Sequence, residues 1–293
     1  MEKIQELPHN VGRESASSIV HIRKFLTLSI GIVMVVVGLG VAVFASIDEL
    51  ATLVPFDVEQ SLSRPYVSAL PVPSPDAKVM EEYLQTLGEK LLLIQKLPAG
   101  MWVKLHYVDE DEVTAFSTVG GHIFVFRGML EKLPHENALV MLLAHEIAHV
   151  KYRHPLKGLG KGVVASLMLS MMFGTAYSDT VDKVFHDAGL LTVLKFSQRQ
   201  EILADEEAMH IYYRYYQHRN GMFDLYRVVE DNHRQQMSGS STAAGIQSGI
   251  ASRIKNIKQR YEKEMLNDQH ALIPFPAHIA AQLSPQLHAG NAL

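Results

Sequence analysis

The chain has 293 residues, a formal net charge of −4 and no cysteine. Without cysteine it forms neither disulfides nor a lipid-modified N-terminal cysteine. It also lacks a cluster of basic residues and a glycine-rich phosphate loop, so we do not expect it to bind nucleic acid or nucleotides.

The first predicted element is an apolar helix near the N-terminus. Residues 25–47 carry no charged side chain, and at about 1.5 Å per residue they cover the roughly 30 Å hydrocarbon core of a bilayer. Basic residues precede this run and acidic residues follow it, so the positive-inside rule predicts one membrane pass with residues 1–24 in the cytoplasm. A signal peptide cleaved near Ala45 is the alternative, but its apolar core would be unusually long.

Between this helix and the rest of the chain, residues 48–75 contain five prolines and are predicted to form a semi-rigid stalk. Ser74-Pro75 is typical of a helix start and predicts a helix to about Leu97. Three short strands are expected over residues 101–108, 112–118 and 122–127, with a Gly-Gly turn between the last two. The pattern is then helical to about residue 265.

Five residues in the helical part, His145-Glu146-Ile147-Ala148-His149, indicate chemistry. Positions four apart lie on one face of a helix, so both imidazoles can bind one metal ion. Glu146 stands beside the first ligand, where it can take a proton from a metal-bound water. The pattern predicts a zinc peptidase, and an ordinary amphipathic helix with two buried histidines is the alternative.

A catalytic zinc site usually has three protein ligands. A third histidine ten residues after His145, as in metzincins, is excluded because position 155 is Pro. Glu201 is the better candidate, since it lies in another predicted helix with Asp205 four residues later on the same face. Asp205 would accept the free N–H of a ligating histidine. His154 is expected near the helix end, as a favourable charge there or as a group beside the ligands.

These stretches resemble a family of zinc metallopeptidases that includes HtpX, the CAAX prenyl endopeptidases and the periplasmic BepA-like proteases. The likeness spans about residues 110–210 and lies in the residues 113–117, 120–125, 145–154 and 196–205. It implies a gluzincin site in which His145, His149 and Glu201 hold one Zn²⁺ per chain.

The resemblance also implies a substrate-binding strand, and this sequence departs from the family pattern at two positions. In the family an edge strand after the Gly-Gly turn faces the substrate, so a peptide would add as an extra strand along Gly121, His122, Ile123 and Phe124. Gln247 stands where some members carry a histidine that caps the zinc, and Thr114 replaces an asparagine. Arg253 is a candidate for stabilising the oxyanion, and a surface arginine on a basic helix is the alternative.

A second apolar stretch, residues 162–177, is too short to span a bilayer alone. Because His149 and Glu201 must meet at one metal, the chain between them crosses a membrane an even number of times. The only candidate for a second crossing, residues 184–196, is short and contains His186 and Asp187. We expect residues 162–177 to lie in the membrane interface or over the active site, with a buried core helix as the alternative. Residues 236–249 are expected to form a mobile loop.

The sequence thus predicts the α+β class: a mostly helical zincin-type metallopeptidase domain with a small antiparallel sheet, preceded by one transmembrane helix. The expected organisation is a cytoplasmic tail, a transmembrane helix, a stalk, a zinc metallopeptidase domain and a C-terminal tail, at residues 1–24, 25–47, 48–75, 76–265 and 266–293.

The predicted function is a membrane-anchored zinc endopeptidase that hydrolyses polypeptides and contacts lipid through its N-terminal helix. The resemblance implies quality control of misfolded envelope proteins at a bacterial inner membrane, with the catalytic domain in the periplasm. A chaperone-like or latent zinc-binding module is one alternative, and a membrane-tethered interaction protein with a coincidental motif is another. The sequence does not set the oligomeric state.

Overall fold

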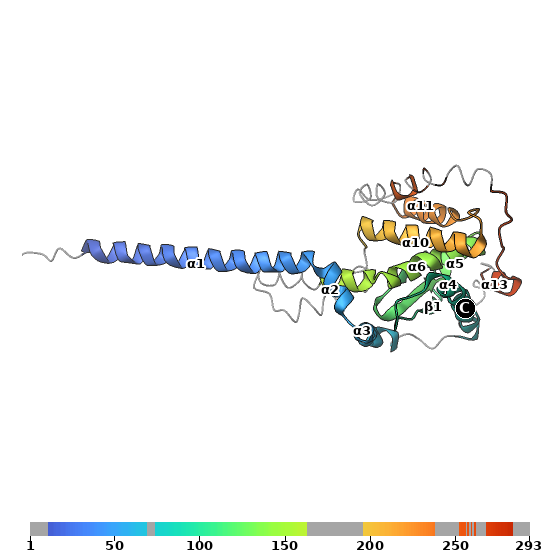
Figure 1. The fold of residues 1–293 in the computed structure, drawn as a ribbon, viewed down its shortest axis with the longest axis horizontal. Helices are drawn as coiled ribbons and strands as arrows, with labels where there is room; N and C mark the ends of the chain where they lie inside the picture. The colour runs from blue at the N-terminus through green and yellow to red at the C-terminus, as the bar shows by residue number, and fades with distance from the viewer. Residues whose placement is uncertain are drawn as a thin grey trace, which may run out of the picture.

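The computed structural model describes residues 11–68, 74–162, 196–237, 252–255, 257, 259, 261 and 268–283. The described residues are mostly helical and hold one small three-stranded sheet, which confirms the expected fold class (Figure 1). Most of the stretch 162–177, most of the loop 236–249, and Gln247 lie outside the described residues.

Helix α1 (Val11–Ala45) projects from the rest of the molecule (Figure 1). Its residues Ile22–Ala45 have a mean hydropathy of 2.7 and none of that window is buried. Within the described ranges it is the one helix long and apolar enough to cross a membrane. It ends at Ser46, where the chain turns into α2 (Ile47–Leu53).

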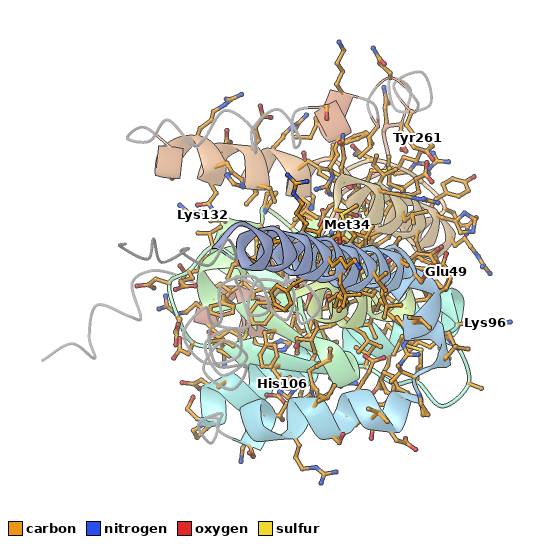
Figure 2. The ribbon with its side chains drawn as sticks, turned by 90° about the vertical axis from the view of Figure 1, so that its left-hand side faces the viewer. Met34, Glu49, Lys96, His106, Lys132 and Tyr261 are labelled. Carbon is orange, nitrogen blue, oxygen red and sulfur yellow. The ribbon has the colours of Figure 1, made fainter. Side chains whose placement is uncertain are left out.

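The segment predicted to form a semi-rigid stalk contains two helices, α2 and α3 (Phe56–Ser68), which the sequence analysis did not predict. Pro55 immediately precedes α3, where a proline is tolerated, and Asp57 and Glu59 in the first turn favour a helix N-terminus. Figure 2, which looks along α1 towards the domain, shows α2 turning away near Glu49 and α3 running across. The segment belongs to the packed body of the protein.

A buried ion pair fastens α3 to that body. The Glu59 carboxylate is only 3% exposed and accepts hydrogen bonds from Arg153 Nε at 2.5 Å and from the backbone N–H of Gly120 at 3.3 Å. Arg153 follows helix α6 in the chain and also donates from Nη1 to the carbonyl of Val54 at 2.6 Å. The pair therefore joins the segment after α1 to the end of α6.

The next helix, α4 (Pro75–Gln95), begins as predicted, with the Ser74 hydroxyl accepting from the Ala77 N–H and Pro75 in the first turn. The sheet contains β1 (Lys104–Val108), β2 (Ala115–Ser117) and β3 (His122–Phe126). A short 3₁₀ turn, η1 (Val119–Gly121), holds both glycines at positive φ and leads into β3.

The sheet is mixed rather than antiparallel throughout. Its order is β1-β3-β2: β2 and β3 form the expected antiparallel hairpin, while β1 pairs in parallel with the other edge of β3. All five residues of β3 are buried, as is usual for a central strand covered on both faces. The continuous apolar run of residues 123–126 was the sequence signal for this position.

Helix α6 (Glu136–Lys151) passes through the core, with Leu139, Met141 and Leu143 fully buried. It lies between the sheet and α10 (Gln198–Tyr216) (Figure 1). The short helix α5 (Arg127–Lys132) connects β3 to it, and residues 154–162 are helical beyond it. Helix α11 (Asp224–Met237) packs on α6 as well.

The described part of the C-terminal tail, residues 268–283, packs onto the domain and ends in α13 (Ala277–Gln282). The backbone of Ile273 donates to Asn137 Oδ1 at 2.7 Å and accepts from the N–H of Glu136 at 2.9 Å. Ile279 is fully buried. This segment therefore contacts the first turn of α6.

Candidate metal centre

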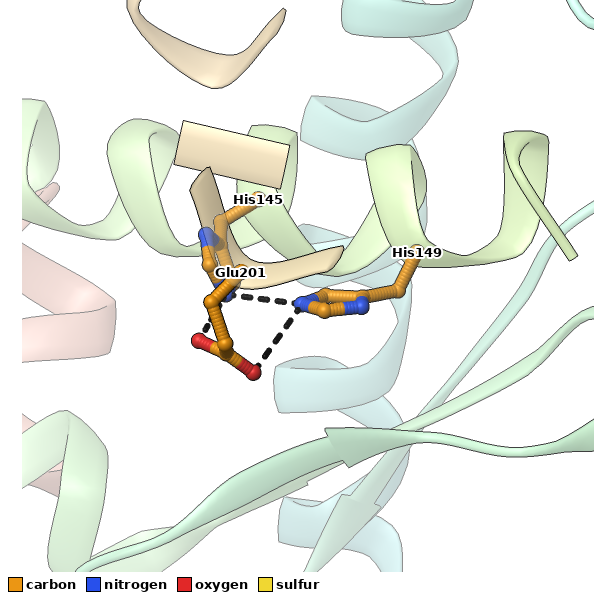
Figure 3. Close-up of side chains that lie close together, drawn as sticks. All are labelled: His145, His149 and Glu201. Atoms are coloured by element: carbon orange, nitrogen blue, oxygen red, sulfur yellow. Dashed lines mark hydrogen bonds and ion pairs between the residues drawn. The ribbon is translucent and has the colours of Figure 1, made fainter. Parts of the chain in front are cut away.

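Helices α6 and α10 bring three metal-binding side chains together (Figure 3). His145 Nε2 and His149 Nε2 lie 3.0 Å apart, and each is 3.8 Å from one oxygen of Glu201. In a tetrahedral site with ligand bonds of about 2 Å, ligand atoms are separated by roughly 3.3 Å. Two imidazole nitrogens and one carboxylate therefore fit a single Zn²⁺, the ion that this donor set suits.

Each histidine is held through its second ring nitrogen. His145 Nδ1 forms a 3.0 Å ion pair with Asp205, which lies one turn after Glu201 on α10. His149 Nδ1 lies 2.9 Å from Nδ1 of the buried His154, and the ring of Phe196 stacks on His149 at 4.0 Å. These contacts orient both rings so that their Nε2 atoms face Glu201.

The surroundings of the site shift the pKa values of the two histidines in opposite directions. Burial, together with the neighbouring His145 and His154, lowers the pKa of His149 well below its ordinary value. That imidazole is therefore neutral at pH 7 and has a free lone pair, as a metal ligand needs. Burial also lowers the pKa of His145, but the hydrogen bond and charge of Asp205 outweigh it and the pKa is raised.

Glu146 lies beside these ligands and is 6% exposed. Burial raises the pKa of its carboxyl group, while the charge of His145 and contacts with Ser117 oppose the shift. A carboxylate with a raised pKa is a better proton acceptor than an exposed one, which suits a general base.

Glu146 lines a cavity of about 230 Å³. The chain just before and within β2 forms one wall, and α11 forms another. Asn232 on α11 joins the two walls, because its side-chain amide donates to the carbonyl of Val113 at 3.3 Å. The polar side chains that line the cavity are Thr114, His145, Glu146, Glu201, Tyr226, Asn232, His233 and Arg253.

Arg253 is neither a surface residue nor free. Its side chain is 15% exposed, and it donates two hydrogen bonds of 2.8 Å to the two oxygens of Asp205. Its Nη1 lies 2.5 Å from Glu201 Oε2. The Tyr226 hydroxyl also donates to Asp205, at 2.9 Å. Arg253 thus contacts both carboxylates, and Tyr226 contacts that of Asp205.

The structure does not place Gly121, His122, Ile123 and Phe124 where the sequence analysis expected a substrate edge. These residues lead into or belong to β3, whose two edges already pair with β1 and β2. None of the four lines the cavity. Ile123 is fully buried and His122 Nδ1 lies 2.9 Å from His106 Nε2. The strand at the edge beside α6 and the cavity is β2.

Sequence reasoning missed the contribution of α11. Residues 225, 226, 229, 232 and 233 all line the cavity, and their spacing is that of one face of a helix. The apolar members of this stripe were visible in the sequence. The polar pair Asn232 and His233 at its end was the signal that this face borders a site.

The match to a family model gives the class of this protein. A family model described as Peptidase family M48 matches residues 78–268, more than half of the chain, and the chain belongs to this family. It is thus a member of a metallopeptidase family, and its His145, His149 and Glu201 could hold a metal ion, which in this family is typically zinc.

Several curated proteins are similar to parts of the chain. Metalloendopeptidase OMA1, mitochondrial, of Danio rerio is 37% identical over 75 residues, 26% of this chain and 16% of that protein. The Beta-barrel assembly-enhancing protease of Yersinia pestis is 27% identical over 105 residues, 32% of this chain and 21% of that protein. Mitochondrial metalloendopeptidase OMA1 of Schizosaccharomyces pombe is 29% identical over 126 residues, which are 42% of this chain and 36% of that protein. The matches thus cover well under half of each relative.

Proposed function

We propose that the protein is a membrane-anchored zinc endopeptidase of the gluzincin type. The observation that carries this proposal is the meeting of His145, His149 and Glu201 beside Glu146, since His145, Glu146 and Glu201 also line one cavity. One Zn²⁺ held there would polarise the scissile carbonyl and lower the pKa of the attacking water.

Glu146 does the proton transfer in this proposal. Its carboxylate accepts a proton from the attacking water and passes it to the amine that leaves. Its burial and raised pKa support the role, because both make it a stronger base than a solvated glutamate.

In this proposal Arg253 does not stabilise the oxyanion, and His233 takes that role instead. Because Arg253 is bonded to Asp205 and Glu201, we assign it to positioning these carboxylates. His233 lines the cavity from α11, is half-buried, and has no hydrogen-bond partner in the described part of the chain. Its N–H is the donor that we assign to the oxyanion developing on the scissile carbonyl.

The peptide would pair with β2. An extended chain adds to an open strand edge through main-chain hydrogen bonds, with little demand on its sequence. Val113, Thr114 and Ala115 line the same cavity as Glu146, so a peptide paired with β2 would lie near this carboxylate. Broad selectivity of this kind suits the removal of misfolded proteins.

The proposed location is a bacterial inner membrane, crossed once by α1, with the catalytic domain in the periplasm. The apolar window of α1 and the basic residues before it support this orientation. A bacterial relative is named for assembly of β-barrels, which supports a role in envelope quality control. A cleaved signal peptide remains the alternative, and the mass of the mature chain distinguishes the two.

The test uses the full chain in detergent micelles, with casein as an unfolded substrate. We expect one zinc per chain at the α6 site and cleavage in the wild type, and zinc without cleavage in Glu146→Gln. The matched control, Glu82→Gln, changes an exposed glutamate on α4 and should cleave normally. Wild type that binds zinc at this site and suppresses aggregation without cleaving would instead favour the chaperone-like module.

A further inference from the structure

A second group of metal-binding side chains lies away from the proposed active site. His218 follows the end of α10, and Asp268 and His270 begin the C-terminal segment. One ligand atom from each of these three residues lies within 4.8 Å of the others. We propose that His218, Asp268 and His270 form a second metal site, which binds a Zn²⁺-like ion with a structural role.

The carboxylate of Asp268 is already held in position. Its Oδ2 accepts hydrogen bonds from the backbone N–H groups of Arg219 at 2.6 Å and Asn220 at 3.0 Å. Its Oδ1 lies 2.7 Å from His270 Nδ1. These contacts fix the orientation of the carboxylate, so it needs little reorganisation to bind a cation.

His218 supplies an independent sign that a ligand is missing. His218 is 8% exposed, and its buried Nδ1 has no hydrogen-bond partner among the described residues. Buried polar nitrogens are almost always paired.

The third ligand is free to adjust. The ring of His270 stacks on that of His218, with centroids 4.7 Å apart, and its side chain is 65% exposed. An exposed ring can turn about its side-chain bonds without disturbing the core. Two imidazole nitrogens and one carboxylate oxygen suit Zn²⁺, and water would complete the coordination.

The site would fasten the C-terminal segment to the start of the catalytic helix. The Asn220 side chain donates to the His270 carbonyl at 2.7 Å, and three residues further on Ile273 pairs with Glu136 and Asn137 of α6. An ion held by His218 on one side and by Asp268 and His270 on the other crosslinks the α10–α11 turn to this segment. Binding of the ion therefore stabilises the folded domain.

The first experiment counts zinc in the full chain, purified in detergent and equilibrated with Zn²⁺. Wild type should hold two ions per chain, and Glu201→Ala and His270→Ala one each. The double variant, which combines Glu201→Ala with His270→Ala, should hold none. The matched control is His278→Ala, an exposed histidine on α13 of the same segment, which should keep two. Two ions retained by His270→Ala, or none left in Glu201→Ala, would overturn the second site.

The second experiment asks whether the remaining ion is structural. Added Zn²⁺ should raise the Tm of Glu201→Ala by about 2–4 °C for each tenfold excess over Kd, because tighter occupancy stabilises the fold. The Tm of the double variant should not respond. His270→Ala should still cleave casein, since the exposed ring lies outside the cavity of Glu146. An equal response of the double variant would reject the site while leaving the peptidase proposal intact.

Discussion

Two pairs of histidines in this protein have nearly the same geometry and opposite surroundings. His145 and His149 on α6 place ring nitrogens 3.0 Å apart, and His106 and His122 in the sheet place theirs 2.9 Å apart. The α6 pair faces the carboxylates of Glu201 and Asp205. The sheet pair has the aromatic ring of Trp102 beside it, and its charged neighbour is Lys104.

The comparison shows that spacing alone does not make a metal site. Burial, and then the positive charge of Lys104, lower the pKa of His106 to about 4; the pKa of His122 is lowered to about 4 by burial, then His106 and Lys104. The sheet pair is therefore neutral, but no carboxylate completes it among the described residues. At α6, Glu201 and Asp205 supply the carboxylates that the proposed zinc site needs.

The largest expected effect comes from removing one histidine of each pair. His149→Ala removes a ligand, so zinc at the active site and casein cleavage should both fall below detection. His106→Gln changes the sheet pair and should leave both unchanged. Metal analysis and cleavage assays on folded protein check this result. Zinc lost equally from both variants would mean that the two pairs do not differ as proposed.

The next effect comes from the carboxylate partner of His145. Asp205→Asn leaves the ligands in place but removes the charge that fixes the ring, and removal of such a partner lowers metal affinity about 10–100-fold. Competition with a zinc chelator measures this change. Tyr226→Phe, which removes only one hydrogen bond to Asp205, should have a smaller effect. An Asp205→Asn affinity equal to wild type would contradict the role of the carboxylate.

His233 tests whether the cavity contains a donor beyond the metal site. His233→Ala should lower kcat about 10²-fold or more with little change in KM and full zinc content, as loss of an oxyanion donor does. His210→Ala, an exposed histidine on α10, is the control and should match wild type. A change confined to KM would place His233 in substrate binding instead.

The last prediction concerns stability rather than zinc binding or cleavage, and it comes from the sheet pair. Since both pKa values are about 4 in the folded protein and near 6.5 in an unfolded chain, the unfolded chain takes up more protons between these pH values. Stability is complete above about pH 6.5 and falls as the pH drops towards 4, by up to about 1.4 kcal/mol per pH unit for each histidine.

Trp102, the single tryptophan of the chain, packs edge-on against His122 with centroids 5.0 Å apart and reports this unfolding by fluorescence. His106→Gln should flatten the dependence of stability on pH over this range. A wild-type stability that stays constant from pH 6.5 to 4 would show that the pair is not buried and neutral.

The parts of the site that are local in sequence could be predicted, and those that depend on distant pairing could not. The helix of His145, Glu146 and His149 follows from residue spacing, and the cap at Ser74 from residue type. The choice of β3 as a substrate edge was wrong because β1 pairs with β3 rather than with β2, a contact that no local pattern encodes. The cluster of His218 and His270 joins residues about fifty positions apart.

The helices in the predicted stalk were missed for a related reason. Its prolines indicated a semi-rigid segment. Pro55, however, stands at the start of α3, and the buried Glu59 that holds this helix in place needs Arg153, almost a hundred residues later. Residue chemistry at one position did not reveal its partner.

The same ion pair determines where a soluble version of the enzyme can begin. A fragment cut at residue 75 would leave the guanidinium of Arg153 in its buried position without Glu59, next to the end of the helix that carries His149. A fragment that begins just after Ala45 keeps α2, α3 and this partner, and removes α1 and the residues before it. Work on the water-soluble domain should therefore start from that longer fragment.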